Sequence, residues 1–486
     1  MSISLGERMS LRDYIRHGYL IARRRIRATY NIVAYKFPVL PPLREMAFLG
    51  RSENRLRTSK YFDYHPLKDE SATLHAIWAV ELITPSQLKR SSRKIARVDW
   101  NASIGTNDGA NDWVERNRNI SSGGWKNLGS AAPIGKNWLG LRKKFRRFPK
   151  SFEYANFHAI KVTPSVSAIV GCFFLSRENR SAYQDIFKSH HFQRAIPQLD
   201  GSIAIHDPWV IKKGKIQQLR ETLRGEVSEF MARNFGGFFT SHDRSRITTV
   251  EVLEFSPGVN ARFREAFYDD IRSWSGSLND LIWSTSREAP VGHSVMSFTS
   301  RSFEGQDFEV WGGENVDALI SRLSFSLPSN WTMLAVTELL SIYDEIISRV
   351  RDAEFRPLTS FRKSGRVLTE EKAHEMMDIE LVTAEITQER LSWLASQMHN
   401  FTMESPSRSG FHSLPEQVME QILQRAEAVK AHHRNIVDAR RAINETYAMF
   451  EMARIARFSL VATFVSALIA GLALLFAFSK NWKTLF

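Results

Sequence analysis

The chain has little cysteine and no export signal. Cys172 is the single cysteine among 486 residues. One cysteine excludes an internal disulfide framework and is typical of a reducing compartment. Residues 1–40 lack the apolar run of about 7–15 residues and the small-residue cleavage site that a signal peptide needs. We therefore expect most of the chain to stay in the cytosol.

One segment near the C-terminus lacks charge altogether. Residues 458–478 read FSLVATFVSALIAGLALLFAF, which is 21 positions without Asp, Glu, Lys or Arg. A helix rises about 1.5 Å per residue, so about twenty residues cross a hydrocarbon layer of roughly 30 Å. No other stretch of the chain is apolar over this length. The sequence predicts a transmembrane helix over 458–478, followed by a short tail, 479–486.

The position of this span and the charges around it predict an orientation. A span so close to the C-terminus is a tail anchor, and its short tail crosses a bilayer more easily than a large folded body does. Basic residues are more numerous before the span than after it, as expected for the cytoplasmic side. They are Arg440, Arg441, Arg454 and Arg457 before it, and Lys480 and Lys483 after it. We predict a single-pass protein of a bacterial inner membrane, with the N-terminal domain cytoplasmic and the C-terminus outside.

Motifs for cofactors and metals are scarce. Gly135-Lys136 resembles the end of a phosphate-binding loop, but the upstream glycine stands one residue too far away. Asn137 also replaces the Ser or Thr that binds magnesium. Glu371 and His374 have the spacing of di-iron ligands, but the helical region holds no second Glu-x-x-His to complete such a site. No cofactor and no metal is predicted, and catalytic residues stay unassigned.

Two His-Asp pairs leave an enzymatic alternative open. His206-Asp207 and His242-Asp243 resemble the His-Asp pair of metal phosphohydrolases. Adjacent His and Asp also occur often in turns, where they serve local structure. The pairs therefore support a membrane-tethered hydrolase only as an alternative function.

Positive charge is concentrated at the N-terminal end of the chain. Residues 1–150 hold 29 Lys and Arg against 12 Asp and Glu, so their surplus exceeds the net charge of +14 of the whole chain. Within 1–45, arginines accompany apolar residues at a spacing of three to four, which predicts a basic amphipathic helix. A second cluster is interleaved with Phe145 and Phe148. The basic patch predicted from both comprises Arg23, Arg24, Arg25, Arg27, Arg142, Lys143, Lys144, Arg146, Arg147 and Lys150.

The basic patch has three interpretations. Anionic lipid headgroups attract basic residues by about 1 kcal/mol each at a membrane surface. Nucleic acid is a less favoured partner, since phosphates attract the same charges. A solvated basic face without a dedicated ligand is the third interpretation. The lipid bilayer is the partner that best fits a chain with a span.

The region 70–325 mixes strand and helix patterns. Residues 75–84, 157–175 and 247–255 have the apolar runs of buried strands, and helical patterns lie between them. Residues 101–139 are rich in Asn, Gly and Ser, which predicts a long loop. The fold class predicted is α+β (mixed α/β) for this cytosolic domain, followed by an all-α stalk and one transmembrane helix.

The region 330–457 is predicted as a helical bundle or stalk. Ser329 or Asn330 is a suitable N-cap for its first helix. Its last helix carries an apolar seam at steps of seven residues, as in a coiled coil. The seam is Ile422, Val429, Ile436, Ile443 and Phe450. The neighbouring row holds Arg425, His432, Ala439, Thr446 and Ala453. One apolar row beside a mixed row favours a helix packed in a bundle over an isolated two-stranded coil.

Small residues form two adjacent ridges inside the predicted span. They are Ala462, Ser466 and Ala470 on one ridge, and Thr463, Ala467 and Gly471 on the other. Small residues at a spacing of four allow two membrane helices to approach closely. The sequence therefore predicts span self-association and a homo-oligomer held through stalk and span.

The function favoured by these features is that of a membrane-anchored binding protein. The cytosolic domain would bind or sense a partner, and the stalk would couple it to a self-associating span. The layout over 330–478 also resembles that of CorA-type magnesium channels, in which a long helix leads directly into the membrane. That resemblance implies an ion-conducting assembly as a further alternative. The second span and the Gly-Met-Asn motif of those channels are absent, so no residue role is carried over.

Overall fold

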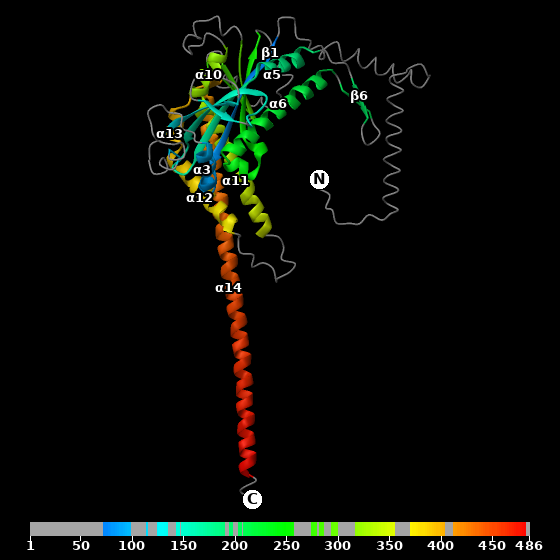
Figure 1. Ribbon diagram of the computed structural model, residues 1–486. Coiled ribbons are helices and arrows are strands. Elements are labelled where there is room, and N and C mark those ends of the chain that lie inside the picture. Colours follow the sequence, from blue (N-terminus) through cyan, green and yellow to red (C-terminus); the bar gives the residue numbers. More distant parts are fainter. Residues whose placement is uncertain are drawn as a thin grey trace, which may run out of the picture. The chain divides into compact units, whose positions relative to one another are not determined.

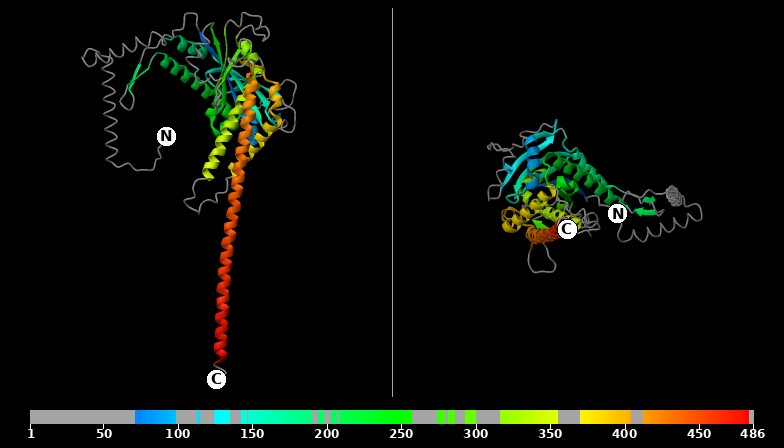
Figure 2. Two further views of the ribbon diagram at one scale, coloured as in Figure 1. Left: turned by 180° about the vertical axis from the view of Figure 1, so that it is seen from behind. Right: turned by 90° about the horizontal axis from the view of Figure 1, so that it is seen from below.

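The computed structural model describes two compact units (Figures 1 and 2). The first, here the sheet unit, takes in residues up to Leu339 together with Glu389–Leu423. The second, the helical unit, consists of Leu340–Gln388 and Gln424–Phe486. The residues described are 71–98, 113–114, 124–134, 142–145, 147–189, 194–197, 203–206, 208–256, 274–278, 281–285, 293–299, 316–354, 370–403 and 412–482.

A sheet of eleven strands, counted over the described residues, forms the core of the sheet unit. Its order is β13-β12-β9-β10-β11-β8-β1-β5-β4-β2-β3, and nine of the strands are longer than two residues. Neighbours are antiparallel except the pairs β11–β8 and β2–β3, which are parallel. The strands are β1 Ala72–Ile83, β2 Trp125–Pro133, β3 Arg142–Phe145, β4 Phe152–Lys161, β5 Ser167–Leu175, β8 Thr248–Phe255, β9 Trp274–Leu278, β10 Leu281–Thr285, β11 His293–Thr299, β12 Thr402–Met403 and β13 His412–Ser413. A separate two-stranded pair consists of β6 Arg194–Pro197 and β7 Ile203–His206.

The helices lie between these strands and after them. Those preceding β8 are η1 Pro85–Gln87, α3 Leu88–Val98, α5 Arg177–Lys188, α6 Pro208–Asn234, α7 Phe238–His242 and η2 Arg244–Arg246. Those following β11 are α10 Val316–Ser326, α11 Pro328–Glu354, α12 Glu370–Glu389, α13 Ser392–Ser396 and α14 Leu414–Trp482.

Helices cover both faces of the sheet. In β1 the Trp78 ring lies 5.3 Å from the Trp331 ring of α11, whereas the Glu81 carboxylate accepts a hydrogen bond from the Phe239 N–H of α7. In a strand, residues an odd number of positions apart point to opposite faces. Helices α11 and α7 therefore lie on opposite faces, which explains why all twelve residues of β1 are buried.

The strand β4 shows the same division. Phe157 packs on Phe230 of α6 with ring centroids 5.8 Å apart. Its neighbour Asn156 points the other way and donates a hydrogen bond to Ser324 of α10 at 3.2 Å. The mixed α+β class predicted from the sequence is confirmed.

One predicted loop contains a strand. Residues 101–139 were expected to lack regular structure, but β2 occupies Trp125–Pro133 within them. This strand pairs with β4 on one side and β3 on the other, and its register shifts between Asn127 and Gly129. Gly129 adopts a φ of 94° at that bulge. Pairing along both edges outweighs the weak strand propensity of WKNLGSAAP, so composition alone gave the wrong prediction here.

The helical region begins differently from the predicted boundary at residue 330. Helix α11 starts at Pro328, and its first turns belong to the sheet unit, where Trp331 also contacts Trp283 at 5.4 Å. Helix α12 ends at Glu389, because Arg390 and Leu391 have positive φ angles. The region 330–457 also contains the two short strands β12 and β13. The predicted N-terminal helix, 1–45, lies outside the described residues.

Candidate membrane anchor

Helix α14 is 69 residues long and is covered over part of its length only. Within the helical unit, His432 bonds to Asp344 of α11 at 3.1 Å, and Lys430 donates to Thr387 of α12 at 3.2 Å. Ile436 is the last buried residue of α14 among those described. Beyond it the helix continues without a break through the apolar segment 458–478.

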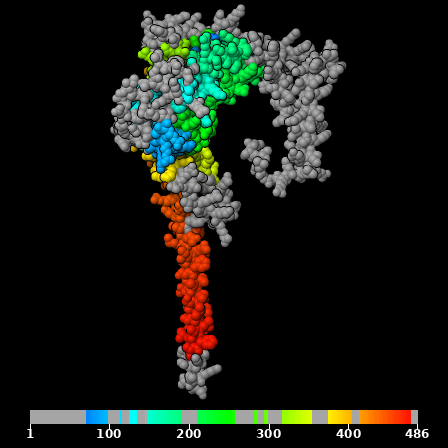
Figure 3. All heavy atoms as spheres, in the orientation of Figure 1, coloured from blue at the N-terminus to red at the C-terminus, as the bar shows by residue number. Residues whose placement is uncertain are grey.

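The apolar part of α14 is exposed throughout its described side chains. Phe458, Phe464 and Leu475 are all more than 60% exposed, and no described segment packs against them (Figure 3). This helix is long and apolar enough to cross a membrane, and none of its most apolar window is buried. Large contiguous apolar surfaces mark interaction or membrane sites. The exposed helix therefore fits a single-pass membrane anchor.

Polar groups and small residues of the apolar segment suit this environment. The Thr463 hydroxyl donates to the Ser459 carbonyl within the same helix at 2.8 Å, so it needs no other partner in a bilayer. Gly471 has no atom within 4 Å of the position that a Cβ would take. The six residues predicted for self-association all lie exposed on this helix, and among the described residues no side chain and no other segment comes within 4 Å of the Cβ position of Gly471.

The structure places part of the basic patch at an edge of the sheet. Residues 142–144 lie in β3, which pairs only with β2 among the described strands. Arg147 and Lys150 are exposed in the turn that follows. Arg146 and the arginines of 1–45 lie outside the described residues.

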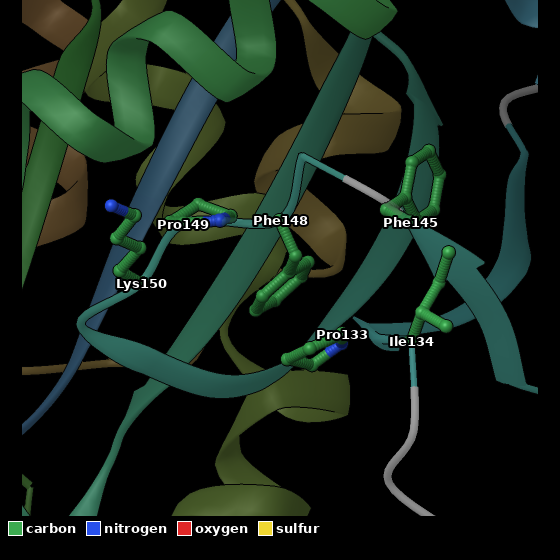
Figure 4. A pocket seen from close by; sticks show the side chains of 6 residues that line it. All are labelled: Pro133, Ile134, Phe145, Phe148, Pro149 and Lys150. Atoms are coloured by element: carbon green, nitrogen blue, oxygen red, sulfur yellow. The ribbon is translucent and has the colours of Figure 1, made fainter.

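The two aromatic residues of this cluster point into the protein. Phe145 and Phe148 lie 5.2 Å and 5.4 Å from the Phe230 ring of α6. Together with Pro133, Ile134, Pro149 and Lys150 they line a pocket of about 480 Å³ (Figure 4). The phenylalanines therefore have a packing role, whereas Arg147 and Lys150 are exposed.

The described parts of the His-Asp pairs have structural roles. His242 is the last residue of α7, and its Nδ1 pairs with the Phe238 carbonyl at 2.9 Å. The Asp243 carboxylate accepts from the Ser245 N–H at 2.9 Å and begins η2. His206 lies in β7, whereas Asp207 is outside the described residues. The described residues contain no group of three or more His, Cys, Asp or Glu that could hold a metal.

Buried charges in the sheet unit were not recognised from the sequence. Glu251 of β8 accepts from Arg220 of α6 at 2.6 Å, and both side chains are at most 4% exposed. Glu338 of α11 pairs with Arg246. In the sequence, the available signal for the buried charge of Glu251 was a carboxylate within an otherwise apolar strand pattern. Each such charge needs a buried partner, so the first pair fixes α6 to β8 and the second joins α11 to η2.

Glu81 caps a helix from inside the core. Its carboxylate accepts from the N–H groups of Phe239 and Thr240 at 2.9 Å and 3.2 Å, and from the Thr240 hydroxyl. Burial raises the pKa of this carboxyl from 4.5 to about 7, against the lowering effect of these hydrogen bonds. The carboxylate form accepts hydrogen bonds from a helix N-terminus, which stabilise it, but burial removes the water that would otherwise solvate it.

His158 is the opposite case on the other face of the sheet. Its ring lies 4.9 Å from Phe325 of α10 and 5.7 Å from Trp125 of β2. Neither ring nitrogen has a hydrogen-bond partner among the described residues. Burial lowers the pKa of His158 from 6.5 to about 4, so this imidazole is neutral in the folded protein at pH 7.

We expect Glu81→Gln and His158→Phe to change the pH dependence of stability in opposite directions. The raised pKa of Glu81 stabilises the fold below pH 4.5, and this contribution is lost as pH rises to about 7. The lowered pKa of His158 stabilises the fold above pH 6.5, and this contribution is lost as pH falls to about 4. The two effects oppose each other in the natural chain between pH 4.5 and 6.5.

Urea unfolding at several pH values measures this balance. As the pH is lowered from 6.5 to 4.5, the free energy of unfolding of Glu81→Gln should fall by about 2–3 kcal/mol relative to that of the natural chain. The free energy of unfolding of His158→Phe should rise by a similar amount over the same pH range, again relative to the natural chain. Profiles parallel to that of the natural chain in both variants would contradict the assignment.

The remaining candidate side chain is a thiol. Cys172 lies in β5, is 1% exposed, and has a pKa raised well above its usual value by burial. It is a packing residue with a protonated thiol.

Comparison of the chain with protein family models, curated proteins and solved structures gave no match.

Proposed function

We propose that the chain is a tail-anchored, single-pass membrane protein whose cytosolic α/β domain binds a partner. The observation that carries this proposal is the exposed apolar end of α14, which continues without a break from helical packing that ends at Ile436. The N-terminal domain is on the cytoplasmic side, the C-terminus is outside, and the membrane is a bacterial inner membrane.

Binding is favoured over catalysis by the local roles of the candidate catalytic residues. His242 and Asp243 each serve the end of a short helix. The buried carboxylates Glu81 and Glu251 hold helices against the sheet, and Glu338 joins α11 to η2. These groups have structural roles. We therefore favour a domain whose surface binds a partner over one that contains a reaction centre.

The span also self-associates in this proposal. The two small-residue ridges let a second span approach closely, and a lone span finds its packing partner in another chain. The continuous helix α14 would then couple the state of the cytosolic domain to the assembled spans.

The basic patch is the surface of the domain that we assign to anionic lipid. Its exposed members Arg147 and Lys150 lie together after β3. Each basic residue near an anionic membrane contributes about 1 kcal/mol. A chain that is already tethered needs only this weak attraction to hold one face of the domain at the bilayer.

The lipid assignment is tested by vesicle flotation with a chain whose span is disabled by Leu468→Arg and Leu472→Arg. We expect this chain to float with vesicles containing anionic lipid and not with neutral ones. Adding Arg147→Glu and Lys150→Glu should reduce flotation by about tenfold or more. Adding Lys89→Glu and Lys215→Glu, which change the charge equally at two other exposed positions, should have a smaller effect. Equal losses in the two quadruple variants would rule out a dedicated patch.

A further inference from the structure

The apolar seam of α14 is covered over its first half only. Its exposed fraction rises from 0% at Ile422 and 2% at Val429 to 4% at Ile436, 38% at Ile443 and 71% at Phe450. The last two residues lie in the juxtamembrane segment, 437–457, between the packed part of α14 and the apolar segment. The same pattern of residues is thus buried within the chain at one end and left uncovered at the other.

The rows beside the seam also change character. Along the packed part, Ala426 and His433 form the second buried row. Arg440 and Arg454 continue that row into the juxtamembrane segment. On the other side of the seam the row there is Ala439, Thr446 and Ala453. A helix that covers Ile443 and Phe450 would therefore approach over these small residues.

Two polar groups near this face are paired within α14. The Thr446 hydroxyl donates to the Ala442 carbonyl at 2.8 Å. A second helix can therefore cover this hydroxyl without leaving its donor unpaired. Arg454 lies 3.5 Å from Glu451 on the same helix. This intrahelical pair reduces the repulsion that arginines would cause when two identical helices meet.

We propose that the face formed by Ile443, Thr446, Phe450 and Ala453 docks against the same face of a second copy of this chain, in parallel and in register. This inference rests on the proposed membrane anchoring, because two spans inserted in the same direction hold their juxtamembrane segments parallel. In such a pair each seam residue meets its own counterpart across a two-fold axis.

The continuity of the face into the apolar segment points to a second copy as its partner. Four steps of seven residues lead from Ile443 through Phe450, Arg457 and Phe464 to Gly471, and three lead from Thr446 through Ala453 and Leu460 to Ala467. Arg457 is the one charged residue on these two paths, and it lies next to the apolar segment, where a long side chain can extend to the lipid headgroups. Both end points belong to one of the small-residue ridges. Left-handed supercoiling keeps positions seven apart on one face. One pairing thus covers the exposed seam in water and the small residues in the bilayer.

Cysteine cross-linking of the full chain in membranes tests this pairing. Cys172 is buried, so it leaves introduced thiols as the reactive ones. We expect Ile443→Cys and Phe450→Cys to form disulfide-linked dimers at least about fivefold faster than Arg441→Cys and Ala448→Cys, which lie on the opposite side of the helix. Equal rates at all four positions, or no dimer at any, would overturn the proposal. Cross-linking to a different protein would do the same.

A pair of charged variants with matched exposure gives a second measurement. Phe450 is 71% exposed and Met452, on the other side of the helix, is 69% exposed. In detergent, sedimentation should show the natural chain and Met452→Lys as dimers and Phe450→Lys as a monomer. Dimeric Phe450→Lys would contradict the docking face. The membrane fraction is recorded for every sample. A natural chain that binds membranes but forms no dimers defeats this inference alone, whereas a natural chain that does not bind membranes also defeats the proposed function.

Discussion

Leu468→Arg combined with Leu472→Arg is expected to remove the full chain from membranes washed at high salt, which screens the weaker attraction of the basic patch to anionic lipid. The segment 458–478 contains twelve Leu, Ile, Val and Phe residues. Each favours insertion by about 0.3–0.6 kcal/mol, which sums to roughly 4–7 kcal/mol. Two arginines near the centre of a span oppose insertion by roughly 5–7 kcal/mol, so they cancel this driving force. Membrane flotation followed by immunoblotting measures the change.

The control carries the same two arginines in the juxtamembrane segment. Met452→Arg and Ile455→Arg replace side chains that are 69% and 64% exposed, compared with 53% and 52% for Leu468 and Leu472. This control should remain in the membrane fraction, because its arginines lie outside the apolar segment. Equal behaviour of the two double variants would show that the position of the charges is irrelevant, and the span assignment would fail.

Gly237→Ala is expected to destabilise the sheet unit by more than about 3 kcal/mol. A Cβ at this position would lie 2.2 Å from the Leu82 carbonyl oxygen and 2.7 Å from the Glu81 side chain. The Leu82 oxygen belongs to the backbone of β1, and Leu82 is paired with Ala168 of β5, so a shift to relieve the clash would disturb that pairing. Gly237 has a φ of −83°, so the cost comes from the close approach and not from its own conformation. Urea unfolding monitored by tryptophan fluorescence measures it.

Gly225→Ala provides the matched control. Gly225 lies within α6 and has no atom within 4 Å of the position of a Cβ. Alanine is favoured over glycine inside a helix by about 1 kcal/mol, so this variant should be more stable than the natural chain. A Gly237→Ala chain as stable as the natural one would show that α7 does not pack on β1 as described.

The strands with a strong apolar pattern could be predicted from the sequence. HAIWAVELIT lies within β1 except for its last residue, Thr84, and ITTVEVLEF covers β8. Runs of β-branched and aromatic residues are characteristic of strands buried on both faces. The strand β2 could not be predicted. Its WKNLGSAAP sequence has weak strand propensity, and its conformation depends on β4, which lies later in the chain.

The apolar segment was evident from its lack of charge, but the limit of its packed stalk was not. The seam residues Ile436 and Ile443 are alike in sequence, yet one is buried and the other exposed. That difference depends on where other helices end, which periodicity does not report. The role of Glu81 was hidden for a similar reason, since its partners Phe239 and Thr240 lie far along the chain.

Membrane insertion of 458–478 is tested most directly by a spin label attached to Ser466→Cys. The buried Cys172 does not compete for the label in the folded chain. In reconstituted vesicles, the label at position 466 should collide often with oxygen, which concentrates in the hydrocarbon, and rarely with a polar nickel complex in the water. A label at Ala448→Cys should show the reverse. Nickel collisions at position 466 as frequent as those at 448 would contradict the membrane span on which the proposed function depends.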